Sequence, residues 1–407
     1  MAAIEFPEAL QKRIEESGPV DLVIGVTGPA DVEELRAKAT AALKGIAAKT
    51  VVAYAGTAEA ESADASAEGI QLAAYPMPEN PVSLAFWLDV AAAQRSVLAL
   101  AAAWQAHACL VMHNDLAALD PETVQLLTEP VLEGKSDLVM PQYPFGKYEG
   151  LINKSLLAPL SRALYGKRVR FPVAFDYCAG ASAAARLVES GTVSGQSETP
   201  LLWPANEVAI NGGRISQAAV DVHHAAQTDD LDLSQVLTEL AGSLFQEAET
   251  NAACWQRVRG SQAVVCYGSA GFAKNDGEPV DARPMVESFV LGSRNLEEVW
   301  RLVMPPATML ELRRLARLDV EQFRLPDALW ARIIYDFALA HRMRRMSRTH
   351  VLGAMTPLYL GWVGSYTQEV GSATVEEADR RVEQLARAFE EQKPYFVSRW
   401  RWPERAN

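Results

Sequence analysis

The sequence predicts an α/β fold, in which a mostly parallel sheet is flanked by helices and a helical C-terminal region packs on it. Short apolar runs alternate with amphipathic helical patterns in the first half of the chain, which is typical of parallel strands joined by helical crossovers. After about residue 230, long helical patterns take over. The length of 407 residues favours two, or at most three, domains, and a composition of 49% apolar and 22% charged residues is typical of globular domains. We place these domains at residues 1–229 and 230–407.

The individual elements follow from apolar periodicity. Apolar runs of strand length occupy residues 21–27, 50–56, 70–75, 108–112 and 137–140. Helical patterns cover residues 31–43, 81–105 and 121–132, the last of which opens on Pro121 at its first turn. Residues 57–69, rich in Ala, Glu and Ser, predict a loop. Later helices are expected from Pro326 onward, over residues 350–370 and over residues 375–392.

The charge balance and the cysteines narrow the function classes. A net charge of −13 disfavours nucleic-acid binding as the main task. The four cysteines form no CxxC pair, which favours a reduced cytoplasmic setting over a disulfide framework. The N-terminus lacks the pattern of a signal peptide, and Gln105 and His107 interrupt the longest apolar stretch, so no transmembrane segment is expected. We expect a soluble cytoplasmic protein, and the sequence leaves open whether it forms a homo-oligomer.

A polar triplet, His113-Asn114-Asp115, follows the strand predicted at residues 108–112. A buried strand with polar side chains at its carboxyl end is how an open α/β sheet presents a functional site. Asp115 offers a hard oxygen ligand suited to Mg²⁺ or Mn²⁺, whereas the imidazole of His113 can bind Mn²⁺ but is a poor ligand for Mg²⁺. Two alternatives stay open: Asp115 as an acid that caps a turn, and His113 as a structural residue.

The block after this triplet carries a resemblance to a known family. Its motifs are Asp137 to Tyr143, Glu149-Gly150-Leu151-Ile152-Asn153, Pro159-Leu160, Tyr165-Gly166 and Arg170-Phe171-Pro172 to Asp176. On these motifs the chain resembles GT-A-fold glycosyltransferases, in particular the glucosyl-3-phosphoglycerate and mannosylglycerate synthase-like branch. Residues 330–338 and 356–361 look like the helical tail of that branch, so the likeness spans most of the chain. About the first hundred residues match only in the rhythm of strands and helices.

The resemblance implies transfer of a sugar from a nucleotide-sugar donor to a small hydroxy-acid or phosphorylated acceptor, with Mn²⁺ or Mg²⁺ beneath the diphosphate. Asp115 corresponds to the second acid of the family's Asp-x-Asp motif, and His113 replaces the first. The third ligand is a histidine after the sheet, for which His224 is preferred to His223; the two cannot both point one way if they lie on a strand. The other implied roles are catalytic for Asp176, substrate-binding for Arg168, Arg170, Tyr143 and Asn153, and nucleotide-binding for Thr27, Ala55 and Gly56.

Three departures from the family pattern favour a second hypothesis. The first strand ends in Thr27-Gly28-Pro29 where the family has Pro-Ser-Tyr-Asn, Ala55 stands where an acid reads the base, and residues 199–203 lack the acid of a Gly-Ile-Asp-Ile-Trp motif. Compared with the family, the chain lacks acidic residues at the positions expected to bind the nucleotide and the metal. It keeps the glycines, prolines and aromatic residues that define the fold. The second hypothesis is therefore a catalytically inactive binding or regulatory protein of the same fold. A nucleotidyltransferase is disfavoured because residues 27–31 include no basic residue.

Two late features are interpreted apart from this block. His341 shares a helix face with apolar residues and is expected in or near the core. A basic segment contains Arg342, Arg344, Arg345 and Arg348. This segment is a solvated face in the simpler interpretation, and a cationic wall for a phosphorylated ligand in the other.

Overall fold

The computed structural model describes residues 6–46, 48–56, 66–67, 70–76, 86–190, 201–224, 232–269, 271 and 280–402. It confirms an α/β protein with a mostly parallel sheet. The chain divides into two compact units. Unit 1 comprises Met1–Pro144, Val169–Gln227 and Ala263–Gly271; unit 2 comprises Phe145–Arg168, Thr228–Gln262 and Phe272–Asn407.

This division differs from the one predicted from the sequence, which has a single domain boundary after residue 229. One join, at Gln227 and Thr228, lies close to that boundary. However, the segment Phe145–Arg168 belongs with the C-terminal helices, and Ala263–Gly271 returns to unit 1, where it supplies the edge strand β11 (Val265–Tyr267). Both exchanges depend on contacts between residues far apart in sequence, which a change in composition along the chain does not reveal.

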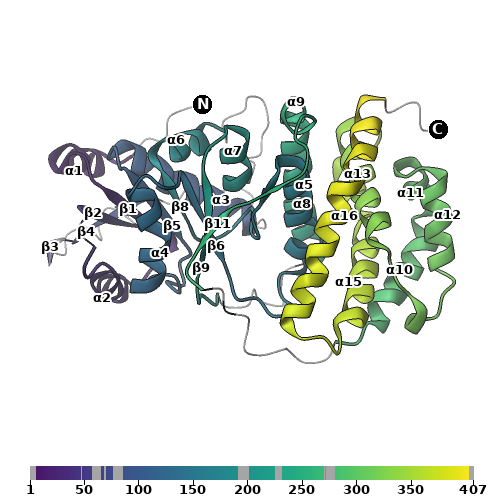
Figure 1. Ribbon diagram of the computed structural model, residues 1–407. Helices are drawn as coiled ribbons and strands as arrows, with labels where there is room; N and C mark the ends of the chain where they lie inside the picture. Colours follow the sequence, from purple (N-terminus) through teal and green to yellow (C-terminus); the bar gives the residue numbers. More distant parts are fainter. Residues whose placement is uncertain are drawn as a thin grey trace. The chain divides into compact units, whose positions relative to one another are not determined.

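Nine strands form one sheet within the described part of unit 1, in the order β11-β9-β6-β8-β5-β1-β2-β4-β3 (Figure 1). Their bounds are β1 (Leu22–Pro29), β2 (Thr50–Ala55), β3 (Ser66–Ala67), β4 (Ile70–Tyr75), β5 (Ala108–Met112), β6 (Leu138–Gln142), β8 (Tyr177–Gly180), β9 (Ile215–Ala219) and β11. The five predicted strands are all present. Pairing is parallel except that β8 is antiparallel to β5 and β6, and β3 to β4.

The described helices of unit 1 are α1 (Glu8–Ser17), α2 (Val32–Ala42), α3 (Phe86–Ala103), α4 (Pro121–Leu132), α6 (Ala181–Ser190) and α7 (Pro204–Ile210). Asp31 and Asp120 cap the N-termini of α2 and α4, since each carboxylate accepts a hydrogen bond from a backbone amide of the first turn. Residues 81–85 of the helix predicted at 81–105 lie outside the described residues, as does most of the predicted loop at 57–69.

Helices cover both faces of the sheet (Figure 1). A Cβ at Gly25 of β1 would lie 2.0 Å from Val97 Cγ1, so α3 packs directly on the β1 backbone. Gly180 of β8 faces α4 instead. Gly25 is in register with Val111 of β5, and Gly180 with Ala108. Since residues 108 and 111 point to opposite faces of a strand, α3 and α4 lie on opposite faces of the sheet.

Helix α3 is the one helix in the described ranges that is long and apolar enough to cross a membrane. Over half of it, 56%, is buried inside the protein. It packs against β1, β5 and α6. Such burial is typical of the core helix of a soluble protein.

Gly25→Ala is expected to destabilise the protein by about 2–3 kcal/mol, because the added methyl group would overlap the side chain of Val97. Chemical denaturation measures the loss. The double variant Gly25→Ala/Val97→Ala should regain much of this loss, since the second change removes the atoms that the new methyl group meets. A single variant as stable as the wild type would contradict the close packing of α3 on β1.

Unit 2 is mostly helical. Its helices are α5 (Ala158–Tyr165), α8 (Leu233–Thr250), α9 (Ala252–Trp255), α10 (Arg283–Asn295), α11 (Glu297–Val303), α12 (Pro306–Leu315), α13 (Asp327–Met343), α14 (Arg348–Gly353), α15 (Thr356–Val370) and α16 (Val375–Arg401), with a π-helix at Asn153–Leu157 and a 3₁₀ turn at Val320–Gln322. The short strands β7 (Lys167–Arg168) and β10 (Gln262–Ala263) pair with each other. The helix predicted at 350–370 is two helices, α14 and α15, and Pro357 lies in the first turn of α15.

The core of unit 2 is aromatic. Trp300, Trp330 and Trp362 are at most 1% exposed, and Trp330 Nε1 donates a hydrogen bond to the Ser155 carbonyl at 2.9 Å.

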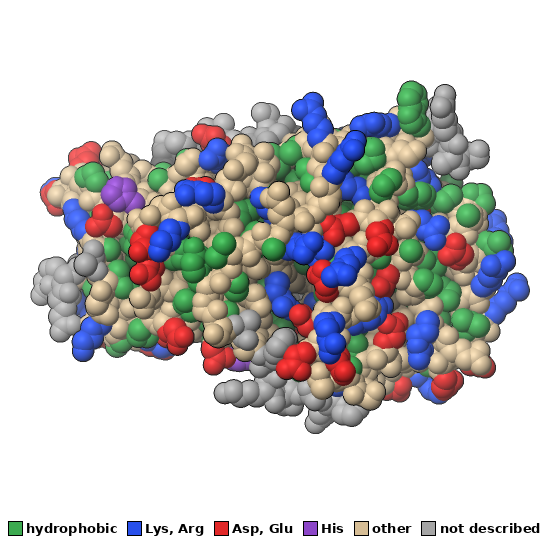
Figure 2. All heavy atoms as spheres, in the orientation of Figure 1, with side chains coloured by type: hydrophobic (Ala, Val, Ile, Leu, Met, Phe, Trp, Pro, Cys, Tyr) green, Lys and Arg blue, Asp and Glu red, His purple; other side chains and the backbone are tan. Residues whose placement is uncertain are grey.

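The surface of the protein mixes charges of both signs: Figure 2 shows acidic and basic side chains interspersed on the visible face. The net negative charge is therefore not gathered into one acidic region on that face.

His341 of α13 lies in this core, as predicted. It is 3% exposed and packs edge-on against Phe245 of α8. Burial of the ring, helped by the charges of Arg348 and Arg344, lowers the pKa of His341 to about 3. The unfolded chain takes up a proton on this residue below about pH 6.5, so stability falls as the pH falls from that value toward 3.

His341→Leu should remove this acid sensitivity, because leucine occupies an apolar site without titrating. Between pH 7 and pH 4.5 the wild type should lose about 2–3 kcal/mol more unfolding free energy than the variant. Denaturant titration at both pH values checks this, with the exposed His350→Leu as the control. Equal acid losses in the wild type and His341→Leu would contradict a neutral buried imidazole.

Candidate metal centre

Three potential metal ligands meet at the carboxyl end of β5. His113 directly follows the strand, Asp115 comes two residues later, and His224 follows β9. Their ligand atoms all lie within 4.8 Å of one another. Asp115 Oδ2 lies 3.2 Å from His113 Nδ1 and 2.9 Å from His224 Nδ1. The three side chains are 20%, 23% and 10% exposed in chain order, so solvent reaches the group.

The turn after β5 explains how Asp115 faces the histidines. Asp115 Oδ1 accepts a hydrogen bond from the Ala117 amide at 3.0 Å, and Leu116 adopts a left-handed conformation with φ of 56°. One carboxylate oxygen therefore holds the turn while the other faces His113 and His224. The two interpretations of Asp115, turn cap and ligand, are compatible in one residue.

The end of β1 lies beside this turn. Thr27 Oγ1 donates to the Met112 carbonyl at 3.0 Å, and a Cβ at Gly28 would lie 2.9 Å from the Asn114 side chain. Glycine at position 28 thus gives Asn114 the space it occupies. Ala55, at the end of β2, is in register with Pro29 of β1 and is 4% exposed. The residues predicted to bind a nucleotide therefore lie on neighbouring strands at the same sheet edge.

Asp176 supports the centre from below the surface and is 1% exposed. Its Oδ1 accepts the His113 backbone N–H at 3.0 Å, and its Oδ2 accepts the Tyr143 hydroxyl at 2.7 Å. The same Oδ2 lies 2.6 Å from His224 Nε2. Asp176 reaches this position because β8 runs antiparallel to β5 and so begins at the edge where β5 ends.

The charges of the cluster shift the pKa values of its members. Burial raises the pKa of Asp115, but hydrogen bonds from His113, His224 and the Ala117 amide outweigh burial and hold that pKa well below its usual range. Burial lowers the pKa of His224, but Asp115 and Asp176 outweigh it and raise that pKa to about 9. In this arrangement a protonated His224 therefore balances the two carboxylates.

Aromatic rings form a wall around the centre. The Phe175 ring centroid lies 4.8 Å from that of His113 and 5.3 Å from that of His224. On its other side Phe175 stacks on Trp87 of α3, with the rings nearly parallel at 4.9 Å. Phe171 packs edge-on against Tyr143 at 5.0 Å. These contacts restrict how far either imidazole can rotate.

The donor set fits a divalent transition-metal ion. It combines one carboxylate oxygen with two imidazole nitrogens, a set better suited to Mn²⁺ than to Mg²⁺. Two ligands at right angles, each about 2.1 Å from one ion, are about 3.0 Å apart. The separations of 2.9 and 3.2 Å between Asp115 Oδ2 and the histidine nitrogens are close to that value. Asp176 on His224 Nε2 is the usual outer partner of a metal-binding histidine.

The other predicted site residues are more dispersed. Tyr143 is 6% exposed and joins the centre through Asp176. The Arg170 amide donates to Gln217 Oε1 at 2.7 Å. Arg168, whose guanidinium donates to Ser261, and Asn153 of the π-helix belong to unit 2. Gly56 donates its amide to the Tyr75 carbonyl and so continues the β2–β4 pairing. His223 is 63% exposed at its side chain, near Asp221, and is not among the three ligands.

Three aromatic residues of this wall, Phe171, Phe175 and Trp87, are not among the predicted site residues. Phe171 and Phe175 lie inside the motif block from Arg170 to Asp176, in which only the two charged ends have predicted roles. Trp87 begins an Ala-rich helix and carries no sequence signal for a site. An aromatic residue directly before a functional acid, as at Phe175, is the one pattern that could have indicated this wall.

The chain matches no protein-family model and no curated protein sequence. The class of protein that the fold and site define is therefore an α/β protein with a candidate metal centre at the carboxyl end of its sheet strands.

Proposed function

We propose that the chain is a metal-dependent glycosyltransferase that moves a hexose from a nucleotide-sugar donor to a small hydroxy-acid or phosphorylated acceptor. The observation that carries this proposal is the convergence of His113 Nδ1, Asp115 Oδ2 and His224 Nδ1 at the sheet edge where β1 and β2 also end. The motif resemblance of residues 113–176 supports the choice of chemistry, and the four free cysteines support a cytoplasmic setting.

In this proposal the anomeric bond to the diphosphate breaks, a bond to the acceptor oxygen forms, and the acceptor hydroxyl proton is released. A bound Mn²⁺ would supply positive charge to the departing diphosphate. The protein's own part is to hold the ligands. Asp176 keeps a proton on His224 Nε2 and thereby leaves Nδ1 to face Asp115. Because Asp176 is buried, we assign it this positioning role in place of direct contact with the acceptor.

A second candidate function, a binding protein without turnover, is favoured by two observations. His224 is hydrogen-bonded to both acids at 2.9 and 2.6 Å, an ion pair that is complete in itself. Ala55 places a methyl group, not a carboxylate, at the end of β2, so its side chain offers no acceptor for the N–H groups of a base.

Calorimetry with Mn²⁺, and then with UDP or GDP in its presence, tests the proposal. One Mn²⁺ should bind, and the diphosphates should bind only with it. His224→Gln should weaken Mn²⁺ at least about tenfold, while the matched variant His223→Gln should bind as the wild type does. Absence of Mn²⁺ binding at millimolar concentration, or equal losses in the two variants, would overturn the metal centre.

Turnover separates the two candidate functions. The full chain is incubated with UDP- and GDP-hexoses, Mn²⁺, and glycerate or phosphoglycerate as acceptor. A glycoside product supports the transferase. Mn²⁺-dependent diphosphate binding without product or donor hydrolysis supports the binding protein.

A further inference from the structure

A small pocket in unit 2, separate from the metal centre, combines positive charge with apolar walls. It has a cavity volume of about 30 Å³ and lies where the end of α11, the end of α13 and the last turns of α16 meet. Met304, Met343 and Met346 contribute thioether side chains, and Leu302, 66% exposed, is also part of the lining. Arg301, Arg345 and Arg399 supply the charge. None of the described lining residues is acidic.

Arg399 contributes a guanidinium group to the lining of this pocket. Its side chain is 14% exposed, and its Nη1 lies 3.2 Å from Asp336 Oδ1 and 3.1 Å from the Tyr395 hydroxyl. Its Nε is buried and has no hydrogen-bond partner among the described residues. Its Nη2 makes no hydrogen bond within the described residues and, unlike Nε, is not buried, so this nitrogen can donate to an acceptor atom from outside the chain.

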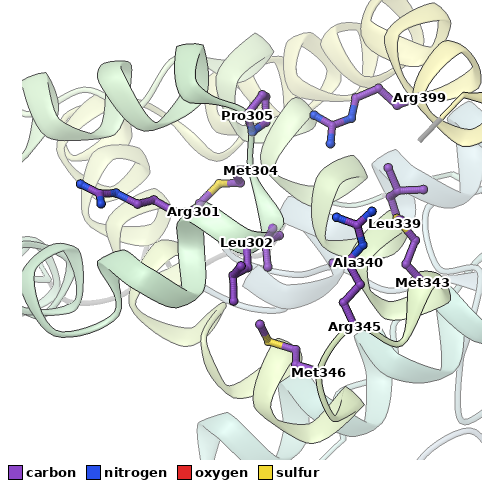
Figure 3. A pocket seen from close by; sticks show the side chains of 11 residues that line it. Arg301, Leu302, Met304, Pro305, Leu339, Ala340, Met343, Arg345, Met346 and Arg399 are labelled. Atoms are coloured by element: carbon purple, nitrogen blue, oxygen red, sulfur yellow. The ribbon is translucent and has the colours of Figure 1, made fainter. Parts of the chain in front are cut away.

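Arg345 contributes a second guanidinium group to the lining of this pocket. Two neighbours of Arg345 in the basic segment have partners within the protein: Arg342 donates a hydrogen bond to the Trp400 carbonyl at 2.8 Å, and Arg348 forms an ion pair with Glu249 at 2.8 Å. Arg345 has no hydrogen bond or ion pair within the described part of the chain. In Figure 3 the guanidinium groups of Arg345 and Arg399 extend toward the same space, whereas Arg301 extends away from it; Arg301 is paired with Glu297.

We propose that this pocket binds an oxyanion carried on an aliphatic chain, that is, a carboxylate or phosphate monoester with an apolar tail. The oxyanion accepts hydrogen bonds from Arg345 and from Arg399 Nη2, an arrangement that guanidinium groups favour. The tail lies against the methionines, whose flexible side chains adapt to aliphatic ligands. A volume of about 30 Å³ admits two or three water-sized groups, which suits such a head group and excludes a sugar or a base.

The test uses the full chain and calorimetric titration with octanoate and with octyl phosphate. Acetate and inorganic phosphate carry the same head groups without the tail, and octyltrimethylammonium carries the tail with the opposite charge. Arg345→Gln removes one cation. The matched control is Arg344→Gln, a neighbouring arginine that is 63% exposed and outside the lining. Arg399→Lys keeps a positive charge near Asp336 but removes the planar guanidinium donors.

Octanoate or octyl phosphate should bind saturably, and both Arg345→Gln and Arg399→Lys should weaken binding about tenfold. Arg344→Gln should bind within about twofold of the wild type, because its charge is screened by solvent. Any of three results would overturn the proposal: no saturable binding of either probe, equal binding of octyltrimethylammonium, or the same loss in Arg344→Gln. Inorganic phosphate bound as tightly as octyl phosphate would also overturn it, by showing that the tail contributes nothing.

Discussion

Asp115→Asn is expected to weaken Mn²⁺ binding at least about 100-fold and to abolish the proposed metal-dependent turnover, because a neutral amide replaces the one carboxylate among the three ligands found in the described residues. Asparagine keeps the shape of the side chain. Its oxygen can still accept the Ala117 amide at the position where Asp115 does so at 3.0 Å, so the turn after β5 should stay folded. Calorimetry or electron paramagnetic resonance of Mn²⁺ measures the affinity.

The matched control for this variant is Asp221→Asn. Asp221 lies close in sequence to His224, is 85% exposed at its side chain, and does not belong to the three ligands. This control should bind Mn²⁺ as the wild type does. If Asp115→Asn keeps an affinity within tenfold of the wild type while circular dichroism shows it folded, the carboxylate is not a ligand and the proposed transferase loses its main support.

Asp176→Ala should lower the free energy of unfolding by about 3–5 kcal/mol, more than any other single substitution proposed for this protein. The change removes the acceptor of the His113 amide, the Tyr143 hydroxyl and His224 at once. Since Asp176 is 1% exposed, little water can reach the donors that are left without it. Chemical denaturation followed by circular dichroism measures the loss.

Asp137→Ala provides the comparison for Asp176→Ala. Asp137 also precedes a strand of the sheet and pairs with an arginine, Arg214, at 2.8 Å, but both side chains are over one third exposed. Its loss should cost about 1 kcal/mol or less. Similar losses in the two variants would mean that burial of Asp176 adds nothing to its interactions, and its assignment as the anchor of the centre would fail.

The sequence predicted the parallel core of the sheet well, because β1, β2, β4, β5 and β6 are short and largely apolar runs. It did not predict the placement of β8. That strand has four residues, Tyr177–Gly180, and its direction depends on pairing with β5 and β6 rather than on its own pattern. The α5 segment was likewise assigned to the first domain, although its partners are C-terminal helices.

For the candidate site, the structure brings together the three residues predicted as ligands, and metal binding by them stays a prediction. Residues 113 and 115 are two positions apart and meet, and of the adjacent pair only His224 joins them, while His223 faces solvent. The role of Asp176 could not be predicted in the same way. Its burial depends on Tyr143 and His224, which lie 33 and 48 residues away in the chain.

The long separations have a consequence for folding. Asp115 and His224 are 109 positions apart. An ion held by both residues would cross-link the chain and close a loop of this length. In the unfolded chain such a closure would cost conformational entropy, whereas in the folded chain the two residues are already close together. Occupancy should therefore raise the melting temperature of the protein in proportion to the logarithm of free ion concentration above its dissociation constant.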